Sequence, residues 1–360
     1  MKSTGSDTKA ALKESTPSII ETNNFSVIAP FLSRCEKDTL VIFDVDNTLL
    51  TPKDAILHAK NSTTMRNIFQ RFENEFPKEH CDKLWTIIAL QRTPKLVDDS
   101  ILNAVNQLKT NGIKAIALTK FSTGSFGLIE SVETWRFNEL DSLGINFSYS
   151  FPHHPELIYL RELEPGKGNY PLYKSGIIFT ATQNKAEALE AFLHKINYLP
   201  KQIIFTDDCL EYLQLVKTFC STNNIDFQGF HYTAIYSENT PPFNEERVAL
   251  QFKTLKEDRK WLSDQEADAN LSKLTLDTLT DHQSGSLKFS KFQEDKANVT
   301  SGLSWFTPKV LLFVGLLGTA AYIVYKIFSD STSDTSIHAP DVFFDTSVIG
   351  NVSGECGLVE

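Results

Sequence analysis

The chain has 360 residues, of which 41% are hydrophobic and 22% charged, enough for one large or two small folded domains. Its formal net charge of −10 opposes non-specific binding to the phosphate backbone of nucleic acids, so we expect no nucleic-acid partner. The five cysteines include no Cys-x-x-Cys pair, which indicates free thiols in a reducing compartment rather than a disulfide-held scaffold.

Residues 1–22 are polar and lack the apolar core of a secretory signal, so we expect a flexible tail there and a folded unit over 23–260. Residues 40–43 form a short apolar run, typical of a strand buried on both faces of a parallel sheet. Asp44 and Asp46 follow at once. Ligands of open α/β sheets bind beyond the carboxyl ends of strands, and buried acids need a partner. The pair therefore favours a bound cation, although an Asx-rich turn gives the same peptide.

The next segment, over about 51–99, is longer than a connecting loop requires. Helices are predicted over 63–72 and 82–90, bounded by Pro77 and Pro94, and we expect them to form a small cap over the site. A second apolar strand over 113–119 then ends in the hydroxyl of Thr119.

A crossover helix is predicted over 125–143, followed by an inserted hairpin region over about 145–180. Lys185 opens a helical pattern of apolar residues, and it leads into a third apolar strand over 202–206. That strand ends in a second acid pair, Asp207-Asp208. Two other lysines, Lys167 and Lys174, precede Lys185 in the same interval.

The order of these features is acid pair, hydroxyl, lysine and acid pair, and it resembles the haloacid dehalogenase-like (HAD) superfamily of phosphatases and phosphotransferases. The first motif of that superfamily, Asp-x-Asp-x-Thr, stands here at residues 44–48. The second corresponds to Thr119, the third to Lys185 and the fourth to Asp207-Asp208. The resemblance covers about residues 38–236.

The resemblance implies a role for each position. Asp44 would be the nucleophile that takes up the phosphoryl group, because a carboxylate is already ionised at neutral pH. Asp46 would protonate the leaving oxygen and then activate water. Thr119 would donate a hydrogen bond to a phosphoryl oxygen, and Lys185 would supply fixed positive charge. An acid at position 46 favours the phosphatase and phosphotransferase branches over dehalogenases and transport ATPases.

The resemblance also implies Mg²⁺ as the cofactor. Mg²⁺ takes oxygen ligands in near-octahedral geometry and keeps several waters. The implied ligands are the Asp44 carboxylate, the backbone carbonyl of Asp46, and Asp207, with Asp208 acting through water.

Beyond residue 240 the chain changes character. A helix is predicted over 244–262, and residues 261–304 have the Ser, Asp, Lys and Thr-rich composition of a polar linker.

Residues 310–325 carry no charge, and the stretch over 305–328 spans about 36 Å as a helix, enough to cross a bilayer core of roughly 30 Å. The alternative is a buried core helix. We predict a transmembrane helix over 305–328, because no domain follows to bury it, and an acidic tail over 329–360.

The predicted membrane helix carries an orientation signal. Lysines lie on its amino side, whereas residues 327–360 contain no Lys or Arg. The positive-inside rule then places the catalytic domain in the cytoplasm of a single-pass protein. The chain also resembles, more narrowly, an uncharacterised family found mainly in intracellular bacteria, in Asp-Asn-Thr-Leu-Leu at 46–50, Gly-Ile-Ile-Phe-Thr at 176–180 and Gly-Phe-His-Tyr-Thr at 229–233. This resemblance leaves open a secreted effector anchored in a host membrane.

Together these observations predict an α/β fold, a HAD-like Rossmannoid three-layer sandwich with a parallel sheet, small cap insertions and one C-terminal transmembrane helix. The expected function is that of a Mg²⁺-dependent phosphatase with a phosphorylated substrate, without indication of the substrate's identity or of the oligomeric state. Two alternatives remain, a phosphotransferase and a non-catalytic binding or scaffold protein. The filled catalytic positions argue against the latter.

Overall fold

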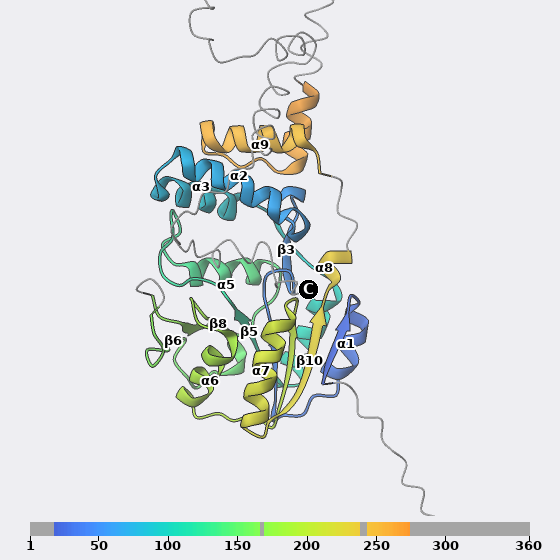
Figure 1. Ribbon diagram of the computed structural model, residues 1–360. Coiled ribbons are helices and arrows are strands. Elements are labelled where there is room, and N and C mark those ends of the chain that lie inside the picture. The colour runs from blue at the N-terminus through green and yellow to red at the C-terminus, as the bar shows by residue number, and fades with distance from the viewer. Residues whose placement is uncertain (1–17, 166–168, 238–242, 274–360) are drawn as a thin grey trace, which may run out of the picture.

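The computed structural model describes residues 18–165, 169–237 and 243–273 (Figure 1). Over these ranges the chain forms a mixed α/β fold, in which helices cover both faces of a mostly parallel central sheet. A helical part, here called the cap, stands above one end of the sheet in Figure 1 and consists of residues 55–91 and 243–273.

The central sheet contains eight strands among the described residues. They lie in the order β1 (Ile19–Thr22), β10 (Asp226–Tyr232), β9 (Gln202–Asp207), β2 (Thr39–Phe43), β5 (Lys114–Thr119), β8 (Ile177–Phe179), β7 (Leu172–Lys174) and β6 (Leu157–Tyr159). In this spatial order, each neighbouring pair from β1 through β10, β9, β2 and β5 to β8 is parallel. Strand β7 is antiparallel to both of its neighbours, β8 and β6. The apolar runs predicted over 40–43, 113–119 and 202–206 are thus three adjacent central strands.

Alternating side chains of β2 serve two separate hydrophobic cores. Val41 and Phe43 belong to one core, and Leu40 and Ile42 belong to the other. Since successive side chains of a strand point to opposite faces, a strand covered on both sides must be apolar throughout. The first core takes in α1 (Phe25–Leu32), α4 (Ser100–Thr110) and α5 (Val132–Ser142), and the second α6 (Lys185–Lys195) and α7 (Leu210–Thr222).

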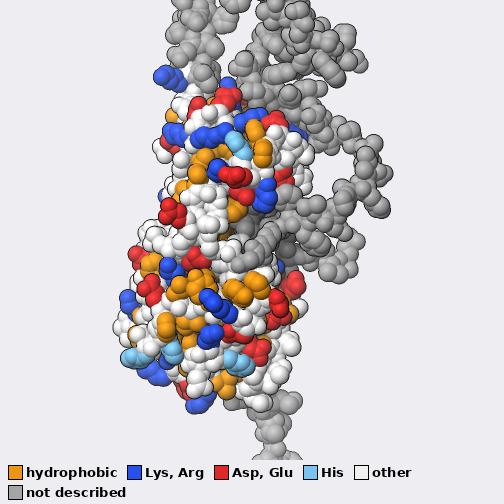
Figure 2. Space-filling model, turned by 90° about the vertical axis from the view of Figure 1, so that its left-hand side faces the viewer, with side chains coloured by type: hydrophobic (Ala, Val, Ile, Leu, Met, Phe, Trp, Pro, Cys, Tyr) orange, Lys and Arg blue, Asp and Glu red, His pale blue; other side chains and the backbone are white. Residues whose placement is uncertain are grey.

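The cap has a hydrophobic core of its own. The short helices η1 (Ala55–Leu57) and η2 (Ala59–Asn61) lead into α2 (Ser62–Glu75) and α3 (Lys78–Gln91). Phe69 of α2 stacks on Trp85 of α3, with ring centroids 3.4 Å apart. A two-stranded antiparallel ribbon, β3 (Leu50–Pro52) and β4 (Pro94–Leu96), joins this helical pair to the core. In the space-filling view the cap and the sheet-bearing core form an upper and a lower part, and both carry charged side chains of either sign (Figure 2).

A segment far downstream completes the cap. Phe252 of α9 (Glu245–Asp258) packs edge-on against Phe69, and Trp261 packs edge-on against Phe252. Trp261 is buried, and its indole Nε1 donates a hydrogen bond to Asp54 Oδ2 at 2.9 Å. Residues 264–273 are helical. The expected linker over 261–304 therefore does not begin at residue 261, because the chain stays folded against the cap through residue 273.

The expected flexible tail over 1–22 also needs correction. Residues 19–22 form β1, an edge strand that pairs in parallel with β10. Asn24 then caps α1, because its side chain accepts a hydrogen bond from the backbone N–H of Ser26. Residues 1–17 lie outside the described residues.

The crossover helix begins later than the expected residue 125. Ser131 is the N-cap of α5 and accepts a hydrogen bond from the backbone N–H of Thr134. Before it, Gly127 has a φ of 56°, a left-handed conformation that ends regular helix. Residues 120–131 are therefore a loop. In the region expected to be a hairpin, over about 145–180, the short helix η3 (Ser148–Ser150) precedes β6, β7 and β8.

The helices in the described ranges include none with the length and apolar character needed to span a bilayer. The segment predicted to do so, over 305–328, lies outside the described residues, as do 274–304 and the expected acidic tail over 329–360.

Candidate active site

Three neighbouring strands bring the predicted residues to one edge of the sheet. Asp44 directly follows β2, Thr119 ends β5 and Asp207 ends β9, and β2 lies between the other two strands. The backbone N–H of Asp44 donates to the carbonyl of Thr206 at 2.9 Å, so the ladder between β2 and β9 continues up to the acid. Parallel strands that end together place their following side chains side by side.

The chain turns sharply after the first acid pair. Asn47 has a φ of 64°, in the left-handed region that Asn tolerates better than most residues. Its backbone N–H donates to the carbonyl of Leu50 at 2.8 Å, which closes the turn. Asp44, Asp46 and Thr48 are all buried here. The turn therefore holds two carboxylates inside the protein at the end of β2.

Lys185 lies at the centre of the site. Asn184 caps α6 by accepting a hydrogen bond from the backbone N–H of Glu187 at 2.9 Å, which fixes the helix start. The Lys185 side chain is 1% exposed, and its Nζ donates to Asp44 Oδ1 at 2.5 Å and to Asp207 Oδ2 at 2.7 Å. Lys174 instead donates to Thr134 Oγ1 from β7, and Lys167 lies outside the described residues.

Burial dominates the electrostatics of the acids. It raises the pKa of Asp207 to about 7, although Lys185 acts in the opposite direction. It also raises the pKa of Asp208, and the neighbouring charges of Asp44 and Asp207 raise it further. Burial opposes the charge of Lys185, but Asp207 and Asp44 outweigh it and raise the lysine pKa. Ionisation of all three acids would therefore place more negative charge in the site than one ammonium balances.

The carboxylates form a group suited to a hard cation. One oxygen from each of Asp44, Asp207 and Asp208 lies within 4.8 Å of the others. Carboxylate oxygens are the ligands that Mg²⁺ prefers, and a divalent cation offsets the excess negative charge. The Asp46 side chain is not in this group, so any contribution of Asp46 comes from its backbone carbonyl. The donor set thus fits the Mg²⁺ that the sequence led us to expect.

Unsatisfied hydroxyls lie beside the carboxylates. The Oγ1 atoms of Thr48 and Thr119 are buried and have no hydrogen-bond partner among the described residues. A buried polar group without a partner costs about 1–3 kcal/mol. A ligand with oxygen acceptors, such as a phosphoryl group, would satisfy the Thr119 hydroxyl.

The Asp46 carboxylate belongs to a buried ion-pair network. Its Oδ2 accepts from Arg136 at 2.9 Å, and Glu139 accepts from both Arg136 and Arg92. Burial raises the Asp46 pKa to about 6, although Arg136 and Arg92 oppose the shift. A carboxyl with this pKa can both give and take a proton near neutral pH.

Sequence reasoning missed these arginines. Arg136 and Glu139 are three residues apart on a helix, the spacing of an ordinary solvated ion pair, and no sequence signal marks them as buried. It also missed Tyr236 of α8 (Ala234–Ser237), whose hydroxyl donates to Asp208 Oδ2 at 3.3 Å. His231 is partly buried and hydrogen bonds to the carbonyl of Asp208 at 3.1 Å.

The chain is similar to proteins of Rickettsia and Chlamydia. It is 26% identical over 246 residues to an uncharacterised protein of Rickettsia prowazekii, which covers 68% of this chain and 88% of that protein. An uncharacterised protein of Rickettsia conorii is 31% identical over 150 residues, 41% of this chain and half of that protein. A more distant relative from Chlamydia pneumoniae, provisionally named as an outer membrane protein, is 23% identical over 216 residues, 59% of this chain and 76% of that protein.

No solved structure matches the chain. The family described as "protein of unknown function (DUF2608)" matches residues 21–268, a range that contains the acidic site and nearly all of the central sheet and of the described cap. With more than half of its length inside this match, the chain belongs to the DUF2608 family.

Proposed function

We propose that this protein is a Mg²⁺-dependent phosphatase with a HAD-like, Rossmannoid three-layer sandwich, acting through an aspartyl-phosphate. The observation that carries the proposal is the contact of Lys185 with both Asp44 and Asp207, inside a cluster of buried carboxylates at the ends of adjacent strands. A structural ion pair needs one acid. Three acids around one lysine leave charge for a cation to neutralise, and the cation attracts a phosphate.

In the first half-reaction, a carboxylate oxygen of Asp44 attacks phosphorus and forms a P–O bond. The bond from phosphorus to the leaving oxygen breaks, and the proton of the Asp46 carboxyl passes to that oxygen. Thr119 donates a hydrogen bond to a phosphoryl oxygen, and Lys185 holds Asp44 in place and offsets charge in the transition state. Bound Mg²⁺ supplies electrostatic stabilisation of the phosphoryl oxygens.

In the second half-reaction, a water attacks phosphorus and gives its proton to the Asp46 carboxylate. The bond between Asp44 and phosphorus breaks, which releases phosphate and restores both residues. Arg136 is a positioning residue in this scheme, because it acts through Asp46, which it holds by an ion pair of 2.9 Å.

Turnover of a generic aryl phosphate by the full-length chain tests the proposal. We expect activity with Mg²⁺ and loss of activity after chelation; full activity in stripped protein would overturn the metal assignment. Asp44→Asn should abolish turnover because it removes the nucleophile, and Asp46→Asn should reduce it by on the order of 10² to 10⁴. Lys185→Met should also abolish it, whereas Lys174→Met, remote from the carboxylates, serves as the matched control.

The same assay separates the alternatives. A rate that rises when hydroxyl acceptors are added, with the phosphoryl group recovered on the acceptor, identifies a phosphotransferase. Absence of turnover across a panel of phosphorylated metabolites, lipids and peptides, by protein that still binds Mg²⁺, favours the non-catalytic binding or scaffold protein.

We also propose that residues 305–328 tether the protein to a membrane as a single-pass helix, with the catalytic domain in the cytoplasm. Two observations support this: the uncharged stretch over 310–325 and the lysines on its amino side. A Chlamydia relative provisionally named as an outer membrane protein supports a membrane location in general terms. A host membrane reached by a secreted protein is a second possible destination.

A further inference from the structure

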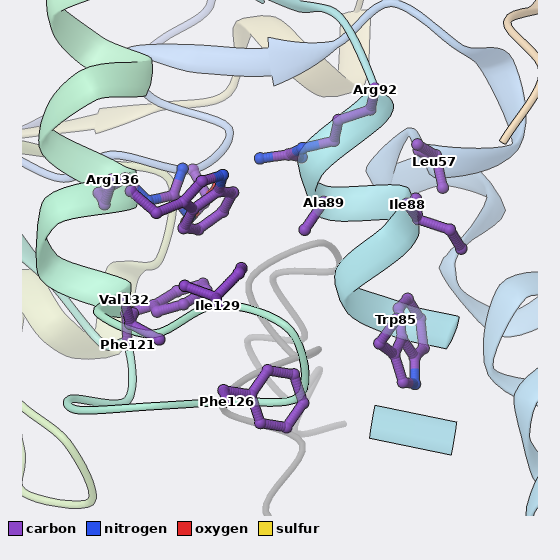
Figure 3. A pocket seen from close by; sticks show the side chains of 12 residues that line it. Leu57, Trp85, Ile88, Ala89, Arg92, Phe121, Phe126, Ile129, Val132 and Arg136 are labelled. Carbon is purple, nitrogen blue, oxygen red and sulfur yellow. The ribbon is translucent and has the colours of Figure 1, made fainter. Parts of the chain in front are cut away.

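A pocket opens beside Asp46, between the cap and the core. One wall comes from α3 of the cap, and the facing wall comes from α5 and the 120–131 loop (Figure 3). Asp46 itself is among the lining residues. Under the proposed function this residue protonates the leaving oxygen, so the pocket lies where the leaving group of the substrate has to sit.

Aromatic side chains form much of the wall. Phe126 projects from the loop, and Trp85 faces it from α3 (Figure 3). Phe121 and Trp135 lie together on the core side, with ring centroids 5.8 Å apart. The aliphatic remainder of the lining is Leu57, Ile88, Ala89, Ile129 and Val132. Flat aromatic walls favour a flat ring over a hydrated chain, because ring faces stack at little entropic cost.

Two arginines extend this stacking surface. Arg92 reaches from α3 across the pocket toward Arg136 on α5 (Figure 3). The guanidinium carbon of Arg136 lies 4.7 Å from the ring centroids of both Phe121 and Trp135, and that of Arg92 lies 5.8 Å from Trp135. A guanidinium is planar and stacks on aromatic faces, so these contacts hold both buried arginine side chains against the rings of the wall.

The charges of these arginines are already paired. Arg136 contacts Asp46 and Glu139, and Arg92 contacts Glu139, so two cations meet two carboxylates. An anionic group on a ligand would have to compete with these carboxyl partners, which already contact both guanidinium groups. By contrast, the Nε atoms of both arginines and Nε1 of Trp85 are buried and have no hydrogen-bond partner among the described residues. Acceptor atoms on an uncharged ligand satisfy such donors.

We propose that this pocket recognises an uncharged aromatic ring bearing hydrogen-bond acceptors. The substrate class is then a phosphate monoester whose leaving group is such a ring, held between α3 and α5 next to Asp46. The inference rests on the proposed phosphatase for the position of the phosphate, but binding of the ring requires no turnover.

The test measures binding to the full-length chain in the Asp44→Asn background, where hydrolysis does not interfere. Binding of 4-nitrophenyl phosphate and of acetyl phosphate is measured by calorimetry. Binding of 4-nitrobenzyl alcohol, which represents the ring alone, is measured by saturation-transfer NMR. We expect 4-nitrophenyl phosphate to bind at least tenfold more tightly than acetyl phosphate, and the ring alone to give a transfer signal.

A substitution that fills the pocket gives the decisive test. Ala89→Phe adds a ring on the pocket wall and should weaken 4-nitrophenyl phosphate at least fivefold relative to acetyl phosphate. Leu90→Phe, the next residue on the same helix and 50% exposed, is the matched control and should change neither affinity. If Ala89→Phe does not fold, Arg92→Lys keeps the charge, removes the planar donor, and should weaken the same probe.

The outcomes separate the two proposals. Ring binding that Ala89→Phe or Arg92→Lys weakens, in a protein without phosphatase activity, supports the pocket and overturns the proposed function. Equal affinity for the aryl and acetyl phosphates, or ring binding that neither variant changes, overturns the pocket while the phosphatase stands on its own assay.

Discussion

Asp207 and Asp208 share one buried space with Asp44, and Lys185 is the cation that contacts two of them. Burying like charges together is unfavourable unless a counter-charge is bound. Lys185 contacts Asp44 and Asp207, and the Tyr236 hydroxyl donates to Asp208. At the scale of single residues, this arrangement is the reason for proposing a cation site at the carboxylates.

We predict that Mg²⁺ raises the thermal unfolding temperature of the full-length chain, because a ligand that binds the folded state alone stabilises it. The gain is about 2.7 kcal/mol when Mg²⁺ is at 100 times its dissociation constant. Asp207→Asn should remove most of this shift. Asp226→Asn, at the exposed start of β10, is the control and should retain it. An equal Mg²⁺ shift in both variants would contradict a cation site at Asp207.

We predict a large loss of stability for Arg136→Met. The substitution removes a 1% exposed guanidinium and leaves Asp46 without its cation, and breaking a buried pair in this way costs about 3–5 kcal/mol. The free energy of unfolding in urea measures the effect. Adding Asp46→Asn should recover part of the loss, because the double variant no longer buries the unpaired Asp46 charge. Additive losses would mean that the two residues do not share a network.

The sequence predicted the residues around the carboxylate cluster and missed the buried arginines that contact Asp46 and Glu139. Asp44, Thr119 and Asp207 follow apolar runs, and the ends of parallel strands meet, so their proximity is a consequence of strand order. Lys185 was one of three candidates, and the structure brings it into contact with the acids. The burial of Arg136 could not be predicted from the sequence, because burial of a helical face depends on what packs against it. The sequence of α5 has no apolar stripe that would show which face is buried.

At the scale of elements, the cap depends on a segment that follows the whole sheet. Trp261 donates from Nε1 to Asp54, Asp264 accepts from the backbone N–H of Ala55, and Trp261 N–H donates to Gln91. These contacts attach the segment after α9 to both ends of the upstream helical pair. The periodicity over 244–262 predicted a helix there, but amphipathic spacing does not name the partner surface. The short edge strand over 19–22 was likewise invisible, because four residues carry little pattern.

We predict that Trp261→Ala loosens the cap more than the core. Removing a buried Trp side chain costs about 3–5 kcal/mol through lost packing, and here it also leaves a hydrogen bond to Asp54 unmade. Hydrogen exchange should speed up in the amides of α2 and α3 and stay unchanged in those of β2 and β9. Lys260→Ala, whose side chain is 55% exposed, is the neighbouring control. Uniform acceleration across the sheet would show that cap and core unfold as one unit.

At the scale of the whole molecule, the proposed tether makes a prediction about location. The full-length chain should sediment with membranes and resist extraction by high salt or alkaline carbonate, because burial of apolar surface in lipid is not screened by ions. A chain ending at residue 301 should stay in solution. Release of the full-length protein by salt alone would remove the membrane part of the proposed function.

Two charges within the tether test its depth in the bilayer. Replacing Leu316 and Leu317 by Arg should release the protein, since each charge at the centre of a bilayer costs about 2.5–3.5 kcal/mol on insertion scales. Replacing the same leucines by Ile keeps the apolar surface and should leave sedimentation unchanged. Retention of the arginine variant in the membrane fraction would indicate that these residues do not lie inside lipid.

The cap consists of two segments that are far apart in the chain, residues 55–91 and 243–273, so they are synthesised at different times. A ribosome releases α2 and α3 early, yet α9 and Trp261 emerge only after the whole central sheet. Until then the cap of the nascent chain is incomplete, and the apolar faces of Phe69 and Phe72 are not covered by α9. Such surfaces attract chaperones and neighbouring chains. Newly made protein therefore passes through an interval in which protection from aggregation has to come from outside the molecule.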